Sequence, residues 1–115
     1  MTLYDLHHEV SLAAAEALAR FGPQAVDRLS EGLLHPEVAV REHAIIGLSR
    51  IQDERVALFL IEMLHDLDRT VKTQAIQSLG ELRDPRAVPM LQEIAANRAD
   101  REMSMLAKQT IEKIK

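Results

Sequence analysis

The side chains in this chain best suited to chemistry are five histidines and eighteen aspartates and glutamates. A histidine stands directly beside a carboxylate at His8-Glu9 and, in the opposite order, at Glu42-His43. Histidine and carboxylate ligands together bind non-haem iron, but such a centre needs several converging ligands and open coordination positions. One pair in each order is too few. We therefore expect no metal site, and no two carboxylates are distinguishable as a catalytic acid and base.

Other reactive groups are missing from the sequence. The absence of cysteine excludes disulfides, thiolate metal sites and cysteine nucleophiles. The four glycines form neither a phosphate-binding loop nor a Gly-x-Ser-x-Gly turn around a nucleophile. Tyr4, Phe21 and Phe59 are the only aromatic residues, too few for a platform that stacks nucleic-acid bases. We expect no catalytic residue and no cofactor.

Length and charge limit the remaining functions. The 115 residues are 47% hydrophobic and suit one folded domain, which we place at residues 1–115. A formal charge of −4 disfavours a surface that follows nucleic-acid phosphates. No apolar run approaches the ~18 residues of a membrane span, and the N-terminus lacks the pattern of a secretion signal. We expect a cytoplasmic protein with no nucleic-acid or membrane partner.

The helices that must position any site follow an internal repeat. A shift of 31 residues aligns residues 25–55 with residues 56–86 without a gap, at both apolar and turn positions. The shift becomes 32 near the C-terminus and 30 near the N-terminus, which makes about three full units preceded by a half unit. The matched pairs include Leu29 with Leu60, Val40 with Val71, Ala44 with Ala75, Ile45 with Ile76, Leu48 with Leu79, Asp53 with Asp84 and Arg55 with Arg86.

The spacing within each unit predicts two helices and no strand. Apolar residues recur three and four positions apart, as at Val40, Ala44, Leu48 and Ile51, which is the pattern of one helical face. We expect Asp53, Asp68, Asp84 and Asp100 to cap helix N-termini, and Pro23, Pro36 and Pro85 to lie in first turns. The predicted helices are residues 8–21, 24–34, 37–51, 54–65, 69–82, 85–97 and 101–114.

One segment carries a family resemblance. Residues 84–91, DPRAVPML, resemble the first helix of a HEAT-type repeat, and are similar to the bacterial and archaeal class called PBS-lyase HEAT-like repeats. Val40-Arg41 and Val71-Lys72, each followed by alanine and leucine, resemble the second helix. The resemblance implies an all-α superhelix, a HEAT-like solenoid of about seven helices in three full hairpin repeats plus an N-terminal half repeat. It also implies protein–protein recognition, with the second helices lining a concave surface.

A helical wheel of the second helices indicates which residues would face a partner. Those opposite the core face form rows across the units, and a further row of small residues, Ala19, Ser49 and Gly80, would let a partner approach the backbone. The competing interpretation is an ordinary solvated face. The candidate partner-binding residues are Glu16, Arg20, Glu42, Ile46, Arg50, Thr73, Gln77 and Glu81.

Three other groups of residues have both a structural and a functional interpretation. Leu58 and Phe59 in helix 54–65, with Met90 from the next unit, form either buried core or an outward patch for a homodimer. Arg41 and Lys72 follow Glu37 and Asp68 by four residues, a spacing that favours pairing within a helix and a ladder of such pairs across stacked units. The competing interpretation is a ligand-binding role. Four arginines near the turns form either an anion-binding rim or locally neutralised pairs with nearby carboxylates, namely Arg50, Arg55, Arg83 and Arg86.

The sequence therefore favours a non-enzymatic scaffold or adaptor that binds another protein on the concave surface of a short solenoid. In an alternative interpretation the chain is a subunit or partner of a bilin (phycobiliprotein) lyase-type or other multi-protein enzyme complex, because some PBS-lyase-like repeat proteins act on bilin pigments. Lys108 stands where Ile45 and Ile76 stand in the earlier units, so we expect a polar end to the stack there.

Overall fold

The computed structural model describes residues 12–115, and within them every regular element is helical. The expected start of the first helix at residue 8, and the pair His8-Glu9, lie outside the described residues. The helices are α1 (Leu12–Ala19), α2 (Val26–Gly32), α3 (Val38–Ser49), α4 (Glu54–Glu62), α5 (Arg69–Leu82), α6 (Val88–Ala96) and α7 (Arg101–Ile114). Three short 3-10 helices extend the first helices of the units: η2 (Gly22–Ala25), η3 (Met63–His65) and η4 (Pro85–Ala87).

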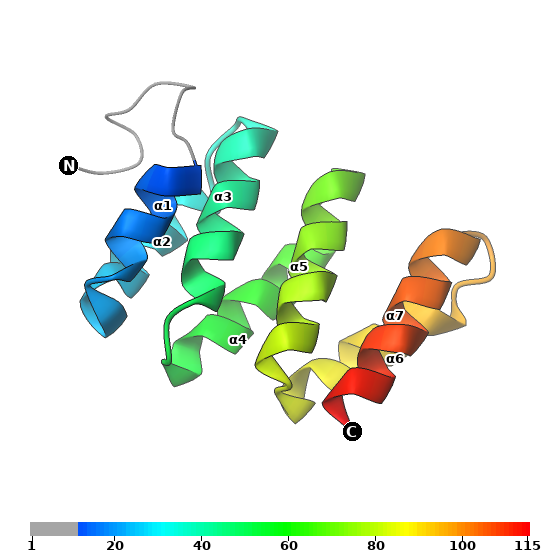
Figure 1. Cartoon of the computed structure of the whole chain (residues 1–115). Helices are drawn as coiled ribbons and strands as arrows, with labels where there is room; N and C mark the ends of the chain where they lie inside the picture. Colours follow the sequence, from blue (N-terminus) through cyan, green and yellow to red (C-terminus); the bar gives the residue numbers. More distant parts are fainter. Residues whose placement is uncertain (1–11) are drawn as a thin grey trace.

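The helices form two rows, and successive hairpins stack along one direction (Figure 1). Helices α1, α3, α5 and α7 lie side by side in the nearer row, each contacting the next, while α2, α4 and α6 lie behind them. The backbone extends 42 Å along the stack and 25 and 17 Å across it. The chain is thus an all-α helical solenoid, as the repeat predicts.

The four predicted N-caps are confirmed. Asp53 and Asp84 each accept a hydrogen bond from the backbone N–H two residues later, Asp68 accepts from Thr70 and Val71, and Asp100 accepts from the N–H of Met103. Each carboxylate thereby satisfies backbone donors that have no partner within the helix. Among the predicted first-turn prolines, Pro23 and Pro85 open 3-10 turns. The prediction for Pro36 was wrong, because Glu37 is the N-cap of α3 and Pro36 precedes it.

Residues at matching positions of the repeat form one continuous core. Ile45 and Ile76 are fully buried, and so are Leu29 and Leu60. Lys108, at the position equivalent to Ile76, is exposed. Because the apolar faces of neighbouring hairpins cover one another, each unit depends on its neighbours for burial.

Two glycines allow the second helices to approach closely. A Cβ atom at Gly47 would lie 3.1 Å from the backbone oxygen of Ala15, and a Cβ at Gly80 would lie 3.1 Å from Cγ2 of Thr110. Gly80 is therefore covered by α7, and Ala19 in the same row is buried. The expectation that this row of small residues admits a partner was wrong at Gly80, because α7 already packs there.

Candidate functional site

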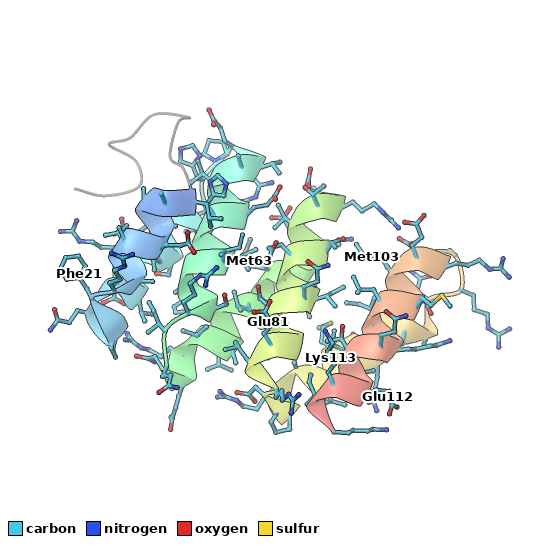
Figure 2. All side chains as sticks on the ribbon, viewed as in Figure 1. Phe21, Met63, Glu81, Met103, Glu112 and Lys113 are labelled. Atoms are coloured by element: carbon cyan, nitrogen blue, oxygen red, sulfur yellow. The ribbon has the colours of Figure 1, made fainter. Side chains whose placement is uncertain are left out.

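The candidate partner-binding residues lie on the solvent side of the nearer row of helices, which we call the second-helix face. Glu16 lies on α1, and Arg20 directly follows that helix. Figure 2 shows the side chains of this row, with Glu81 of α5 and Lys113 of α7 labelled on it. The remaining candidates are Glu42 and Ile46 on α3, Arg50 at its C-cap, and Thr73 and Gln77 on α5.

The first of three hollows on this face lies between α1 and α3. It has a volume of about 390 Å³ and is lined by Ala13, Glu16, Ala19, Arg20 and Arg50. Glu16 and Arg50 form an ion pair across it at 2.9 Å. Both side chains are well exposed to solvent, so the pair contributes little to stability and is available for rearrangement on binding.

A second hollow of about 350 Å³ lies between α3 and α5. The hydroxyl of Thr70 donates to Oε1 of Glu42 at 3.0 Å, which joins the two helices. The hydroxyl of Thr73 donates to the carbonyl of Arg69 at 2.9 Å. Hydroxyl, amide and charged groups therefore line this hollow, from Glu42, Arg69, Thr70, Thr73, Gln74 and Gln77.

The third hollow, of about 450 Å³, lies at the end of the row where the chain turns into the next unit. Arg50 and Glu81 border it, together with the capping residues Asp53 and Asp84. Seven of the eight candidates thus line the three hollows: Glu16, Arg20 and Arg50 line the first, Glu42, Thr73 and Gln77 line the second, and Arg50 and Glu81 line the third. Ile46 is half-buried and lines none of the three.

The apolar patch predicted in helix 54–65 divides into buried and exposed parts. Phe59 and Met90 are half-buried and pack against the core. Leu58 keeps 51% of its surface exposed. The other large apolar side chains exposed among residues 12–115 are scattered over the chain, at Phe21, Leu34, Leu67 and Met105.

Three of the four arginines at the turns, Arg50, Arg55 and Arg86, are held by carboxylates, in agreement with local neutralisation. Arg83 makes no ion pair with any residue of 12–115. Arg55 binds the capping Asp53 and also reaches the carbonyl of Pro23 in the preceding unit at 3.3 Å. Arg86 repeats this arrangement with Asp84 and the carbonyl of Glu54, at 2.9 Å. The hydrogen bond from Arg55 lowers the pKa of Asp53 to about 2. These two arginines therefore join successive first helices and do not form an open anion site.

The predicted pairing within helices at Arg41 and Lys72 was wrong. Arg41 reaches across to Asp66 in the next unit, with Nε to Oδ2 at 2.9 Å, and donates to the carbonyls of His35 and Pro36 at 2.8 and 2.9 Å. Asp68 caps its own helix, and Lys72 makes no ion pair with any residue of 12–115. Arg41 thus connects two units, which a spacing within one helix does not reveal.

A third connection between units was not anticipated from the sequence. Arg69 at the start of α5 binds both oxygens of Asp100 at the start of α7, at 2.6 and 2.9 Å. This hydrogen-bonded pair lowers the pKa of Asp100 to about 2 and raises that of Arg69. The repeat contains a signal for this pair, because Arg69 begins α5 and Asp100 directly precedes α7, and these are the second helices of adjacent units.

No group of three or more histidine, aspartate and glutamate side chains among residues 12–115 is arranged to hold a metal ion. Within the same residues, no helix combines the length and apolar character that crossing a bilayer requires.

Comparison with protein families agrees with the stacked hairpins. The family model described as HEAT repeats matches residues 2–79 and again residues 35–112. The chain belongs to the HEAT-repeat family. Repeats of this family commonly mediate protein–protein interaction through the extended surfaces that stacking creates. No curated protein sequence matches this HEAT-repeat chain closely enough to indicate a relative.

Proposed function

We propose that this HEAT-repeat chain is a cytoplasmic, non-enzymatic scaffold or adaptor that binds another protein along the second-helix face. The observation that carries the proposal is the row of three hollows on that face, bordered by seven of the eight candidate residues. Ion pairs such as Arg41–Asp66 and Arg69–Asp100 join successive units beneath the hollows, so the surface is formed before a partner binds. A preformed surface loses less conformational entropy when a partner binds.

The charges of this surface indicate the chemistry of the partner. Arg20 is exposed and forms no ion pair with any residue of 12–115, so it is available to an acidic group. The second hollow offers hydroxyl and amide groups from Thr73 and Gln77, and Glu81 adds a negative charge at the third. A partner that binds this face therefore presents an acidic group to Arg20, polar groups to the second hollow and a basic group to Glu81.

Affinity capture from native lysate, followed by mass spectrometry, identifies the partner for a direct binding test. The double variant Arg20→Glu with Glu81→Arg reverses the two end charges of the face without touching the core. We expect its dissociation constant for the verified partner to rise at least tenfold with unchanged helical circular dichroism. Arg98→Glu, an exposed reversal in the α6–α7 connection, serves as the control and keeps wild-type affinity. Unchanged affinity in the double variant contradicts the proposal.

We also assign the repeats to the PBS-lyase HEAT-like type, on the strength of residues 84–91. In that setting the alternative function is a subunit of a bilin lyase-type complex, although the chain has no cysteine and few aromatic residues. Bilin added to the purified protein distinguishes the two, because a lyase-type role produces a shift of the pigment's absorbance band. Homodimerisation through Leu58, Phe59 and Met90 would rest mainly on the exposed Leu58, and sedimentation of Leu58→Ser over a concentration series tests it.

A further inference from the structure

A fourth hollow lies away from the second-helix face, where the second and third units meet. It has a volume of about 240 Å³, is partly open to solvent and lies between η3, α5, α6 and the start of α7. Ile76, Met90, Ile94 and Met103 give it an apolar wall. Its polar lining residues are Lys72 and Asn97, with His65, Glu93 and Asp100. We call it the Lys72 hollow. Met103 is labelled near the start of α7 in Figure 2.

The repeat provides an internal reference for this hollow. Arg41 and Asp66 occupy the positions 31 residues before Lys72 and Asn97. There the Arg41 guanidinium binds both oxygens of the Asp66 carboxylate, at 2.9 and 3.3 Å, with only 16% and 11% of the two side chains exposed. At the first junction between units, therefore, a carboxylate from the chain itself neutralises the cation.

At the second junction the cation remains and the carboxylate does not. Oδ1 of Asp66 accepts the N–H of Asp68 at 2.8 Å, and Oδ1 of Asn97 accepts the N–H of Ala99 at 3.0 Å. Asn97 thus keeps the hydrogen bond that shapes the turn but lacks the negative charge. Met90 also replaces the ring of Phe59, which leaves a flexible side chain at the apolar wall.

The carboxylates beside the hollow do not replace the missing one. Asp100 lines the hollow, and the nearby charge of Lys72 contributes to its lowered pKa. Its two oxygens, however, are bound by Arg69 at 2.6 and 2.9 Å, and it caps α7. Glu93 is exposed at the rim. Lys72 is half-buried and makes no ion pair with any residue of 12–115. A half-buried cation beside an apolar wall can bind a ligand that has an anionic group and an apolar chain.

We propose that the Lys72 hollow binds a small aliphatic carboxylate. The carboxylate supplies the negative charge that Asp66 supplies at the first junction, pairs with the Lys72 ammonium and accepts a hydrogen bond from Nδ2 of Asn97. The alkyl stem lies against Met90, Ile94 and Met103. This assignment is independent of the second-helix face and of any protein partner.

The size of the hollow limits the ligand. A volume of 240 Å³ corresponds to roughly eight water molecules at about 30 Å³ each. Hexanoate, with eight non-hydrogen atoms, is therefore a suitable probe. For so small a ligand we expect a dissociation constant in the millimolar range, roughly 1 mM.

Methionine methyl NMR reports on this hollow directly, because Met90 and Met103 line it whereas Met63 and Met105 do not. Hexanoate titrated at pH 7 into protein labelled with 13C at the methionine methyls should shift Met90 and Met103 saturably, and 1-hexanol should not. Lys72→Gln should weaken binding about tenfold. Asn97→Asp restores the internal carboxylate and should weaken binding by a similar factor while raising the melting temperature.

Several results would overturn the assignment. The first is the lack of a saturable shift at 20-fold above the expected constant, which is ~20 mM hexanoate. The second is binding of 1-hexanol as tight as that of hexanoate. The third is an Asn97→Asp variant that binds hexanoate with the wild-type constant. Asn97 is exposed, so its replacement by the isosteric aspartate keeps the test valid even if Lys72→Gln fails to fold.

Discussion

The Arg41–Asp66 pair at the junction of the first two full units allows the sharpest test of how the solenoid is held together. Asp66→Asn removes the charge but keeps an oxygen for the N–H of Asp68. It leaves Arg41, which is 16% exposed, with only the carbonyls of His35 and Pro36 as acceptors. Removing one partner of a fully buried ion pair costs about 3–5 kcal/mol. Because Arg41 keeps two hydrogen bonds and some water contact, we expect a loss of about 2 kcal/mol.

Urea unfolding followed by far-UV circular dichroism measures this loss, and the thermal midpoint should fall by roughly 8 °C. The sequence of the next junction supplies the control. Arg41→Lys with Asp66→Asn copies Lys72 and Asn97, and the double-mutant cycle measures the part of the pair's energy that depends on the guanidinium group. We expect a coupling energy of about 1–2 kcal/mol. A loss below ~0.5 kcal/mol for Asp66→Asn, together with near-zero coupling, refutes the idea that this pair joins the units.

Two further predictions concern packing and pH. Gly47→Ala should destabilise the fold by roughly 1–3 kcal/mol because the new Cβ meets the backbone oxygen of Ala15. The Cβ of Gly80→Ala meets only the Thr110 side chain, so this substitution should cost less. Equal losses of stability in urea unfolding would contradict this reasoning. Asp53 and Asp100 have folded-state pKa values of about 2 against about 3.9 unfolded, so their stabilisation is complete above pH ~4 and declines as the pH falls toward 2. The urea midpoint of the wild-type protein should therefore drop between pH 5 and pH 2.5. The drop should be smaller in Asp100→Asn, and an equal drop would count against a stabilising Arg69–Asp100 pair.

The features that the sequence predicts well are those decided by local chemistry. The helix boundaries follow from apolar spacing and from capping aspartates such as Asp53 and Asp84, because a cap acts within three residues of its own position. The buried positions follow from the repeat, since Ile45 and Ile76 must face the same kind of neighbour in successive units. The residues of the second-helix face can likewise be predicted, because a helical wheel gives the direction in which each side chain points.

The features that the sequence does not predict depend on side chains of one unit that contact the next unit. Arg41 extends to Asp66, 25 residues away, although Glu37 stands one turn before it on the same surface. Spacing along one helix carries no information on how far a long side chain extends toward the next turn. The partial burial of Phe59 and the covering of Gly80 by Thr110 have the same cause, because the tilt between hairpins decides which side chains meet.

Mapping the footprint of a captured partner by backbone amide NMR tests the central claim most directly. If the second-helix face is the binding surface, amide shifts on saturation concentrate in α3 and α5, at Glu42, Thr73, Gln77 and their neighbours, and leave α4 and α6 unchanged. Shifts concentrated around Leu58 in α4 or along α6, with α3 and α5 unaffected, would contradict the account.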